Sequence, residues 1–529
     1  MQAKDYVFEK KADGAYQRKC YGYEALGCQM IDQADGFPQC VVSTTLNFKT
    51  PLTRETLKSK LVDALILSRH QSPGIALKIV KLQPPETEYA LTYGVPKSLE
   101  DANAWANAQI EVFDDVKSIL VRHGEIRDCH WWRCDSGSYI VKAFIAPSES
   151  GWHLSILIPH CIIDGRGTFT LLDIILKQLN SIIDGTAKPT SSLSWGEETP
   201  RLPLPGPFVH ALVKTGSLPA IPDPSVLAPP PPSDDKPPAP PSKIPWVTPP
   251  VKVSESTARD LNRRFALSKE VTSKLHAASK AHGVTITNVA SAFLALAFTE
   301  SLLKGAAKAG EERFKAVYGG FTNSTHFLLP MNFVDQRARL PDGYNSLSTP
   351  ENNKGVPFIG LDCAEINIPL ENIRKLVAVD EGSKNVERKS ADADAKDVFW
   401  KLVGEAAADW KQRDISPEMY FMRSFGLHML GNSPLNPAIF GMAEPFISSI
   451  GDLSRLGLLE EFRPSKGAAA FTVEDIMFTI RMVWPPIITF LYEFDEVLYL
   501  ASCTGEQHGS DKVLDDFVDA VKAWIEAIL

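Results

Sequence analysis

A proline-rich stretch near the middle of the chain most constrains the fold. Residues 201–250 hold 17 of the 39 prolines, and their centre is a run of four, Pro229 to Pro232. Proline donates no hydrogen bond to a sheet and breaks a helix interior, so we expect an extended, semi-rigid or disordered connector. Such a run is sometimes a ligand for aromatic grooves, but a crossover between two halves of one enzyme is the simpler interpretation. The chain is therefore predicted to comprise an N-terminal lobe (1–200), a crossover linker (201–255) and a C-terminal lobe (256–529).

Composition argues against several classes of partner. The net charge is −9 over 529 residues, and no block of Lys or Arg offsets it, which disfavours nucleic acid and anionic membranes. The N-terminal residues Met1–Tyr6 lack the apolar core of a secretion signal, and we find no apolar run of about 18 residues. Cys129 and Cys134 have no second pair that would complete a zinc site. We expect a cytoplasmic protein with reduced cysteines, no metal, no membrane contact and no nucleic-acid partner.

Strand and helix patterns alternate in both halves of the chain. β-branched or apolar runs predict strands, and apolar residues at helical spacing after Thr53, Gly165 and Ser268 predict helices. This mixture indicates an α/β protein with two lobes of similar design. The expected strands are 41–48, 139–145, 152–158, 327–332, 446–450, 478–482, 488–492 and 497–502, and long helices are expected from about 285 to 302 and from 511 to 529.

The strongest local signal for chemistry is His160-x-x-x-Asp164-Gly165, at the end of an apolar strand. A histidine with a pKa near ~6.5 accepts a proton at physiological pH, and at a strand end its ring can project into a channel. Asp164 is suited to a salt bridge that fixes the turn. Gly165 is expected to permit a backbone angle that other residues resist. His-x-x-x-Asp also occurs by chance, and an isolated buried histidine is more often structural.

The motif resembles the His-x-x-x-Asp-Gly signature of the coenzyme-A-dependent acyltransferase superfamily, which includes BAHD enzymes, chloramphenicol acetyltransferase and peptide-synthetase condensation domains. Other segments resemble this superfamily in the same order along the chain. Fungal trichothecene 15-O-acetyltransferases look most similar in length and in the long proline-rich crossover. The further segments are Leu65–Pro73, Phe265–Thr285, Val334–Pro341 with its Asp335-x-Arg337-x-Arg339-Leu340 pattern, and Ser448-Ser449-Ile450-Gly451-Asp452.

The resemblance implies two chloramphenicol-acetyltransferase-like lobes, each a mixed sheet flanked by helices, with the active-site channel between them. It implies that His160 is the general base in direct acyl transfer from acetyl-coenzyme A to a hydroxyl, with no acyl-enzyme. The acceptor is expected to be an apolar fungal secondary metabolite such as a trichothecene. Asp164 is expected to pair with Arg337 and, with Gly165, to support the catalytic loop. Ser448, Ser449 and Gly451 are candidates for binding coenzyme A or the oxyanion, and a monomer is expected.

Two departures from the family pattern qualify the comparison with BAHD enzymes. Pro159 stands where many members have a second histidine, and the Asp-Phe-Gly-Trp-Gly loop is absent. Neighbouring reactive residues are interpreted as structural. Cys161 and His153 lie on the opposite strand face from His160 by their odd offsets, and Trp131 and Trp132 are more typical of a core than of a substrate pocket.

Two alternative functions stay open at this level. One is a condensation-type enzyme that forms amides from a carrier-bound thioester; the chain has no Asp-Ser-Leu carrier motif, so it would need a partner. The other is a non-catalytic binding protein on the same fold, against which the intact His160 motif argues.

Overall fold

The computed structural model describes most of the chain. Described are residues 1–34, 36–82, 88–129, 132, 134, 137–227, 259–339, 359–389, 393–434, 444–467, 469–483, 486–506 and 511–529. The predicted linker therefore lies partly outside the described residues, as do Trp131, Leu340 and Pro341.

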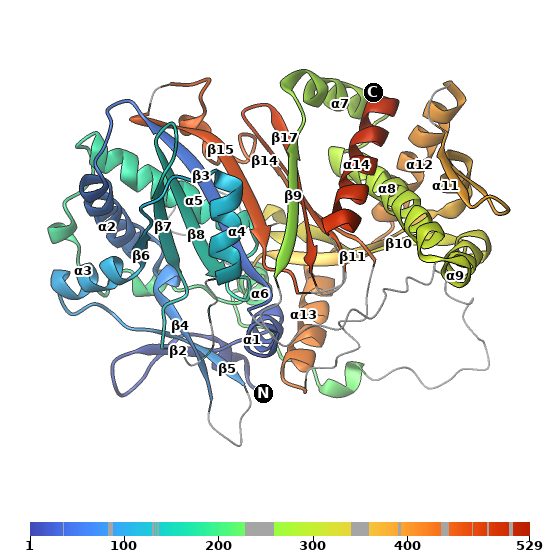
Figure 1. The fold of residues 1–529 in the computed structure, drawn as a ribbon. Helices are drawn as coiled ribbons and strands as arrows, with labels where there is room; N and C mark the ends of the chain where they lie inside the picture. Colours follow the sequence, from blue (N-terminus) through green and yellow to red (C-terminus); the bar gives the residue numbers. More distant parts are fainter. Residues whose placement is uncertain are drawn as a thin grey trace.

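The first lobe is built on a five-stranded sheet with α-helices on both faces (Figure 1). Val41 packs with Ile126 of α4 (Ile119–Cys129), whereas the next residue, Val42, belongs to the core that includes Phe169 of α5 (Gly165–Ile183). Successive strand residues face opposite sides, so α4 and α5 cover opposite faces. The strand order is β15 (Phe471–Ile480), β3 (Gln39–Phe48), β8 (Trp152–Pro159), β7 (Lys142–Pro147) and β6 (Ile110–Val112), and α2 (Arg54–Gln71) and α3 (Leu99–Ala108) complete the lobe.

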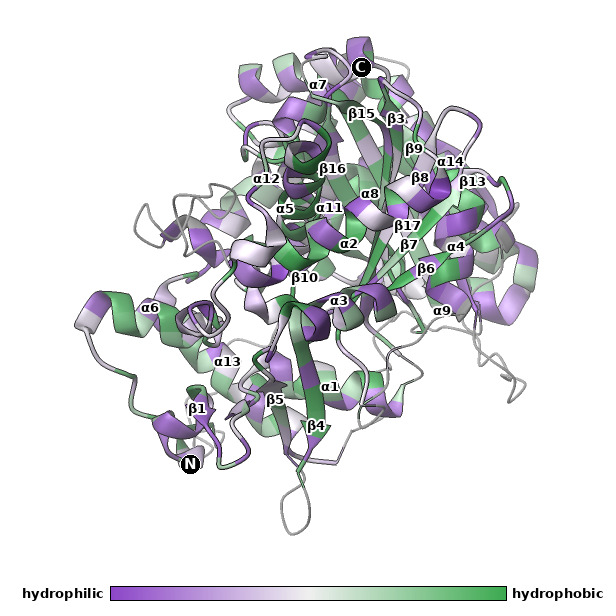
Figure 2. Cartoon of the chain, turned by 90° about the vertical axis from the view of Figure 1, so that its left-hand side faces the viewer, coloured by the Kyte–Doolittle hydropathy of each residue, from purple (hydrophilic) through white to green (hydrophobic). Residues whose placement is uncertain are grey.

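The second lobe contains a six-stranded mixed sheet. Its strands run in the order β11 (Leu361–Pro369), β10 (His326–Asp335), β14 (Phe446–Asp452), β16 (Ile488–Phe494), β17 (Val497–Gly505) and β9 (Asp260–Ala266). Figure 2 shows hydrophobic residues gathered on the central strands and on the inner faces of the helices. The helices of this lobe are α7 (Lys269–Ala281), α8 (Ile286–Ala309), α9 (Glu311–Asn323), α11 (Leu370–Leu376), α12 (Ala393–Lys411) and α14 (Asp511–Ile528), and β12 (Val377–Asp380) pairs with β13 (Asn385–Arg388).

The two lobes are interlocked by β15. This strand comes from the C-terminal half of the sequence, yet it pairs antiparallel with β3 along its whole length, from Phe471 opposite Phe48 to Ile480 opposite Cys40. The neighbouring strands β14 and β16 stay in the second sheet. A division of the chain at one linker therefore does not by itself separate the two lobes.

A smaller layer lies below both sheets and includes the N-terminal segment (Figure 1). It contains the four-stranded sheet β1 (Glu9–Lys10), β2 (Tyr16–Lys19), β5 (Tyr89–Tyr93) and β4 (Leu77–Lys81), with helices α1 (Tyr23–Gln33), α6 (Gly206–Thr215) and α13 (Pro417–Gly431). The expectation of an extended connector is wrong for α6. Pro207 stands in the first turn, where a missing N–H costs nothing, and Phe208 is fully buried against Tyr6 and Tyr21.

Helix α8 corrects the expectation that the chain holds no apolar segment of about 18 residues. By length and composition it is apolar enough to span a membrane, with a mean hydropathy of 1.5 in its most apolar window. In the structure, 72% of that window is buried inside the protein. Val289, Phe293 and Leu296 pack in the core of the second lobe. The helix is apolar on nearly all sides because it is a central core element.

We predict that Gly27→Ala destabilises the protein. A Cβ at Gly27 in α1 would lie 2.7 Å from Cβ and 2.9 Å from Cα of Cys161, and a main-chain atom cannot move aside cheaply. Overpacking of this kind costs about 1–3 kcal/mol. Thermal unfolding checks it, with Gly404→Ala in α12 as the control, since a Cβ there meets open space and should stabilise the helix by about 0.5–1 kcal/mol. Equal melting temperatures for the two variants would contradict the packing argument.

Candidate active site

His160 is placed by the end of strand β8. The strand ends at Pro159, and the main-chain N–H of His160 then donates a 3.0 Å hydrogen bond to the carbonyl of Pro38, just before β3. Helix α5 begins five residues later at Gly165. A short turn held to two neighbouring strands leaves the imidazole few positions to adopt.

The imidazole of His160 is partly exposed to an internal cavity. Its Nδ1 atom is buried. Desolvation lowers the pKa of His160 below its ordinary value, and the nearby carbonyl groups of His160 and Ile163 and the charge of Asp164 oppose this only in part. Nδ1 makes no hydrogen bond within the described residues, whereas Nε2 is not among the buried, unpartnered atoms, so Nε2 is the nitrogen open to the cavity. A neutral ring of this kind can accept a proton.

Asp164 also lines the cavity, but its carboxylate is buried and saturated with hydrogen bonds. Its Oδ1 accepts from the Gly167 N–H at 2.8 Å and from Arg337 Nη2 at 3.0 Å. Its Oδ2 accepts from the Gly360 N–H at 2.8 Å and from Arg337 Nη1 at 2.9 Å. Asp164 is also the N-cap of α5. Burial acts to raise the pKa of Asp164, but the Arg337 charge and these donors outweigh it and lower the pKa.

Arg337 and Arg166 tie the two lobes together at this point. Arg337 follows β10 of the second lobe, and its Nη1 also donates to Asp335 Oδ1 at 3.0 Å. Arg166, in the first turn of α5, pairs with Asp335 and donates to the Ile450 carbonyl at 3.0 Å. Burial acts to lower the pKa of Arg337, and the two carboxylates outweigh it. The Asp164–Arg337 pair predicted from the sequence is present.

Gly165 and Gly167 are both closely packed, and Gly167 more tightly than Gly165. Gly165 does not adopt a left-handed conformation, so the predicted reason for this glycine is wrong. A Cβ at Gly165 would lie 3.3 Å from Ile450 Cδ1 and 3.3 Å from Phe478 Cζ, and one at Gly167 would lie 2.6 Å from Ile163 Cγ1. The first turn of α5 therefore packs against β15 of its own sheet and against Ile450 of the second lobe.

A cavity of about 710 Å³ extends from His160 between the lobes and the helical layer below. Strands β10, β14 and β16 form one side, α1 and α13 form another, and α6 contributes at one end. Most of the wall is apolar, which favours an apolar ligand that buries most of its surface. The large apolar lining residues include Leu26, Met30, Phe37, Met331, Phe333, Ile359, Leu361, Leu427, Phe446, Ile450, Met482 and Phe490.

The three candidates on β14 are placed differently. Ser448 and Ser449 line the cavity, and Thr287 in the first turn of α8 donates a 2.8 Å hydrogen bond to the Ser449 hydroxyl oxygen. This leaves the Ser449 proton available to another acceptor. Gly451 has a φ of 100° at a bulge in β14, and it is not among the residues that line the cavity. The positive φ of Gly451 instead lets the strand bend at this point, close to Arg166 and the ion-pair network.

The neighbouring reactive residues are placed as the sequence predicted. Cys161 is fully buried against α1, and desolvation raises the pKa of its thiol to about 11. His153 is buried on the other strand face, where its ring contacts the Thr45 hydroxyl at 3.0 Å and the Lys117 carbonyl at 2.9 Å. Trp132 is part of the hydrophobic core. None of these three lines the cavity.

Several cavity residues were not found from the sequence. Tyr23 packs edge-on against His160, with ring centroids 5.4 Å apart, and Arg423 of α13 pairs with Asp362 of β11. Gly27 of α1 lies close to Cys161, and Gly431 of α13 lies close to the main chain of α1. A Cβ at Gly431 would lie 2.4 Å from the Leu26 main-chain nitrogen. The glycines at these positions are the one feature of the sequence that could have indicated that α1 and α13 pack closely.

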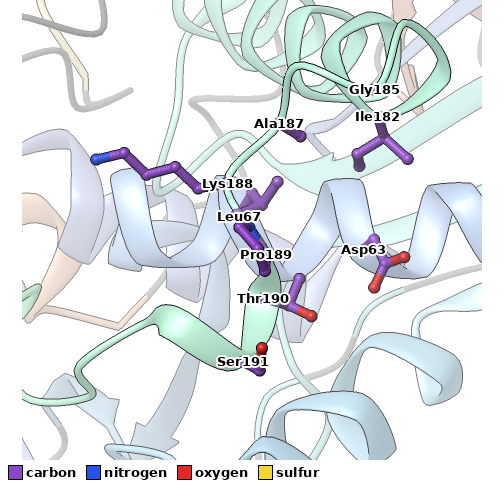
Figure 3. A pocket seen from close by; sticks show the side chains of 9 residues that line it. All are labelled: Asp63, Leu67, Ile182, Gly185, Ala187, Lys188, Pro189, Thr190 and Ser191. Atoms are coloured by element: carbon purple, nitrogen blue, oxygen red, sulfur yellow. The ribbon is translucent and has the colours of Figure 1, made fainter.

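A second hollow, of about 270 Å³, lies at the surface beside α2 and the segment that follows α5 (Figure 3). It is lined by residues such as Asp63, Lys188 and Ser191, and it shares none of them with the central cavity. Within the described ranges, no cluster of three or more His, Cys, Asp or Glu side chains is arranged to hold a metal.

Solved structures with the same architecture decide the fold. No protein-family model matches the sequence, and no curated protein matches it. The structure is similar to that of TRI3 trichothecene 15-O-acetyltransferase from Fusarium sporotrichioides, with a TM-score of 0.72, 16% identity, and coverage of 100% of this chain and 99% of that chain. This chain has the two-lobed α/β fold of that acetyltransferase and of the condensation domains.

Two more distant structures share the acyltransferase–condensation fold. The first condensation domain of the calcium-dependent antibiotic synthetase, in complex with a substrate analogue, has a TM-score of 0.54 at 12% identity, with 97% of both chains covered. Polyketide synthase associated protein 5 from Mycobacterium tuberculosis has a TM-score of 0.51 at 13% identity, with 96% of both chains covered. At identities this low, structural similarity establishes the architecture alone. The predicted two-lobed α/β fold is confirmed.

We predict that Arg337→Met lowers stability more than any single exposed substitution. It leaves the Asp164 carboxylate buried without its charged partner, a change that typically costs about 3–5 kcal/mol. Because the folded-state pKa of Asp164 is depressed, this stabilisation exists above the unfolded pKa of ~4 and is lost as pH falls through the lower folded value. Urea unfolding at pH 7 and pH 3 measures both effects, with the exposed Arg455→Met as control. A gap between wild type and Arg337→Met that widens as pH falls below 4 would contradict this account.

Proposed function

We propose that this chain is an acyl-coenzyme-A-dependent O-acyltransferase in which His160 is the general base. One observation carries the proposal: the His160 imidazole faces a large apolar cavity at the junction of the lobes, while Asp164 is fully engaged elsewhere. The histidine is thus free for chemistry, and the aspartate is a positioning residue.

The proposed reaction needs only the two substrates and one imidazole. His160 Nε2 accepts the proton of the acceptor hydroxyl as the oxygen attacks the thioester carbonyl carbon. The tetrahedral intermediate collapses, the carbon–sulfur bond breaks, and the leaving thiolate takes the proton back from His160. The imidazole ends neutral, and no acyl-enzyme forms. General-base catalysis contributes about 10²–10⁴ in rate, and holding both substrates in one site supplies much of the rest.

Ser448 and Ser449 are proposed to stabilise the oxyanion or to bind coenzyme A. Thr287 supports this role for Ser449, because its hydrogen bond occupies the Ser449 oxygen and directs the Ser449 proton elsewhere. A preorganised donor in a cavity with little water is worth far more than one in solvent. Gly451 is proposed to act indirectly, through the shape of β14.

The acceptor is proposed to be an apolar alcohol, and the donor acetyl-coenzyme A. The apolar cavity wall supports the first choice, and the overall similarity to a trichothecene 15-O-acetyltransferase supports acetyl transfer to a fungal secondary metabolite such as a trichothecene. The monomeric state and the cytoplasmic location stay predictions.

We predict that His160→Ala lowers the single-turnover rate by about 10²–10⁴, because the general base is lost. The affinity for acetyl-coenzyme A should change little. Release of free thiol from acetyl-coenzyme A in the presence of a panel of terpenoid alcohols measures it. His282→Ala is the matched control, since His282 is exposed and stacks on Trp400 in the second lobe. Unchanged turnover in His160→Ala would exclude the proposed role.

The pH dependence gives an independent prediction. Because burial lowers the pKa of His160, the ring is neutral and competent at pH 7, and protonation removes activity only on the acid side. We expect kcat/KM to be flat from about pH 7 to 8.5 and to fall with an inflection below ~6.5. An inflection above 7 would contradict the assigned environment.

Condensation domains share the fold, so a carrier-bound thioester is the second candidate donor. Side-by-side assays with acetyl-coenzyme A and with an acetylated carrier protein separate the two. We predict faster transfer from acetyl-coenzyme A; transfer only from the carrier would favour the condensation-type alternative.

A further inference from the structure

The charged side chains that line the central cavity are already engaged by other protein groups. Such pairing leaves them little capacity to bind the oxygens of an apolar alcohol. The pairs are Glu24 with Arg18, Asp164 with Arg337, Arg166 with Asp335, and Asp362 with Arg423. Any polar recognition of the acceptor near His160 must therefore come from neutral groups.

Tyr23 is such a group, and it lies beside the proposed base. It is the first residue of α1, it lines the cavity, and its ring meets His160 edge-on with centroids 5.4 Å apart at 60°. Within the described chain its hydroxyl makes no hydrogen bond, and the oxygen is not one of the buried, unpartnered atoms. The hydroxyl is thus open to a ligand in the cavity.

Other hydroxyls of the same cavity differ in this respect. The Tyr420 hydroxyl donates to the Ile359 carbonyl at 3.2 Å, and Ser433 Oγ donates to the Met429 carbonyl at 2.7 Å. The Tyr21 oxygen is buried without a partner, and so is inaccessible. Tyr23 combines an accessible oxygen with contact to His160, which none of these three does.

The phenol stays a donor throughout the working pH range. Burial raises the pKa of Tyr23 well above its ordinary value, with the nearby groups Cys40, Cys161, Cys363 and Asp164 acting in the same direction. A neutral O–H that loses its water when an apolar ligand enters pays a desolvation cost unless the ligand supplies an acceptor. A site of this kind discriminates strongly against an analogue that lacks the matching oxygen.

We propose that the Tyr23 hydroxyl binds a second oxygen of the acceptor, within a few bonds of the hydroxyl that is acylated. The proposal rests on the proposed function, because it takes His160 as the place where the reacting hydroxyl sits. It narrows the substrate class to polyoxygenated apolar alcohols, such as vicinal diols, hydroxy ethers or hydroxy ketones on a rigid carbon skeleton. Tyr23 is then a specificity-determining residue that touches substrate.

Tyr23→Phe tests this by removing one oxygen and keeping the ring against His160. The substrates are a rigid terpenoid with a vicinal diol and its monodeoxy analogue, each with acetyl-coenzyme A. We expect wild type to favour the diol at least 10-fold in kcat/KM, and Tyr23→Phe to lose that preference, mainly through the KM for the diol. The preference should not vary between pH 6.5 and 8.5. Equal losses for both alcohols, or an unchanged preference, would overturn the proposal.

Tyr420→Phe is the matched control, because it removes a hydroxyl from the same cavity that is committed to the main chain. It should change both alcohols equally, so the diol preference should persist; loss of the preference in this variant too would overturn the assignment to Tyr23.

Equilibrium binding separates this inference from the proposed reaction. Calorimetric titration of both alcohols into His160→Ala and into His160→Ala with Tyr23→Phe requires no turnover. Tighter binding of the diol that disappears with Tyr23→Phe supports the inference even if no acyl transfer is found. Equal binding of the two alcohols to His160→Ala overturns it even if acyl transfer is confirmed.

Discussion

The ion pair between Asp164 and Arg337 is the interaction on which the remaining geometry depends. It joins the first lobe to the second across a junction where both partners are buried, and two main-chain N–H groups complete the coordination of the carboxylate. A buried carboxylate is tolerated only when its charge and its lone pairs are satisfied. Four donors meet that condition, and in meeting it they fix the start of α5 and the turn that presents His160.

The two ionisable residues of the motif, His160 and Asp164, have different roles in this arrangement. The charge of Asp164 is paired with Arg337 and stabilises the structure. The lowered pKa of His160 favours a neutral imidazole, with one nitrogen toward the cavity. Strand β15 and the Arg166–Asp335 pair add further links between the lobes, so the cavity wall is assembled from segments far apart in sequence. The proposed acyl transfer needs His160 and both substrates in a fixed arrangement, and these links between the lobes favour such an arrangement.

The sequence predicted the parts of this architecture that follow from local patterns or from resemblance. The strands that became β3, β8, β16 and β17, the cap at Thr53 and the Asp164–Arg337 pair are examples. It did not predict that β15 joins the first sheet, because strand pairing across the whole chain leaves no local pattern. It missed α6 because prolines dominate that region, and it missed Tyr23 because a ring contact with a residue far along the chain leaves no local pattern. The sequence predicted an unusual backbone angle at Gly165, whereas the structure shows crowding by Ile450 and Phe478. Such crowding depends on tertiary packing, so no local pattern indicates it.

A crystal structure with coenzyme A and an acceptor alcohol bound would test the central claim most directly. The account predicts the acceptor hydroxyl in the interlobe cavity, at about 2.6–3.2 Å from Nε2 of His160, with the thiol of coenzyme A close to the same atom and the Asp164 carboxylate still bound to Arg337. An alcohol bound elsewhere, or an imidazole that reaches neither substrate in the ternary complex, would contradict it.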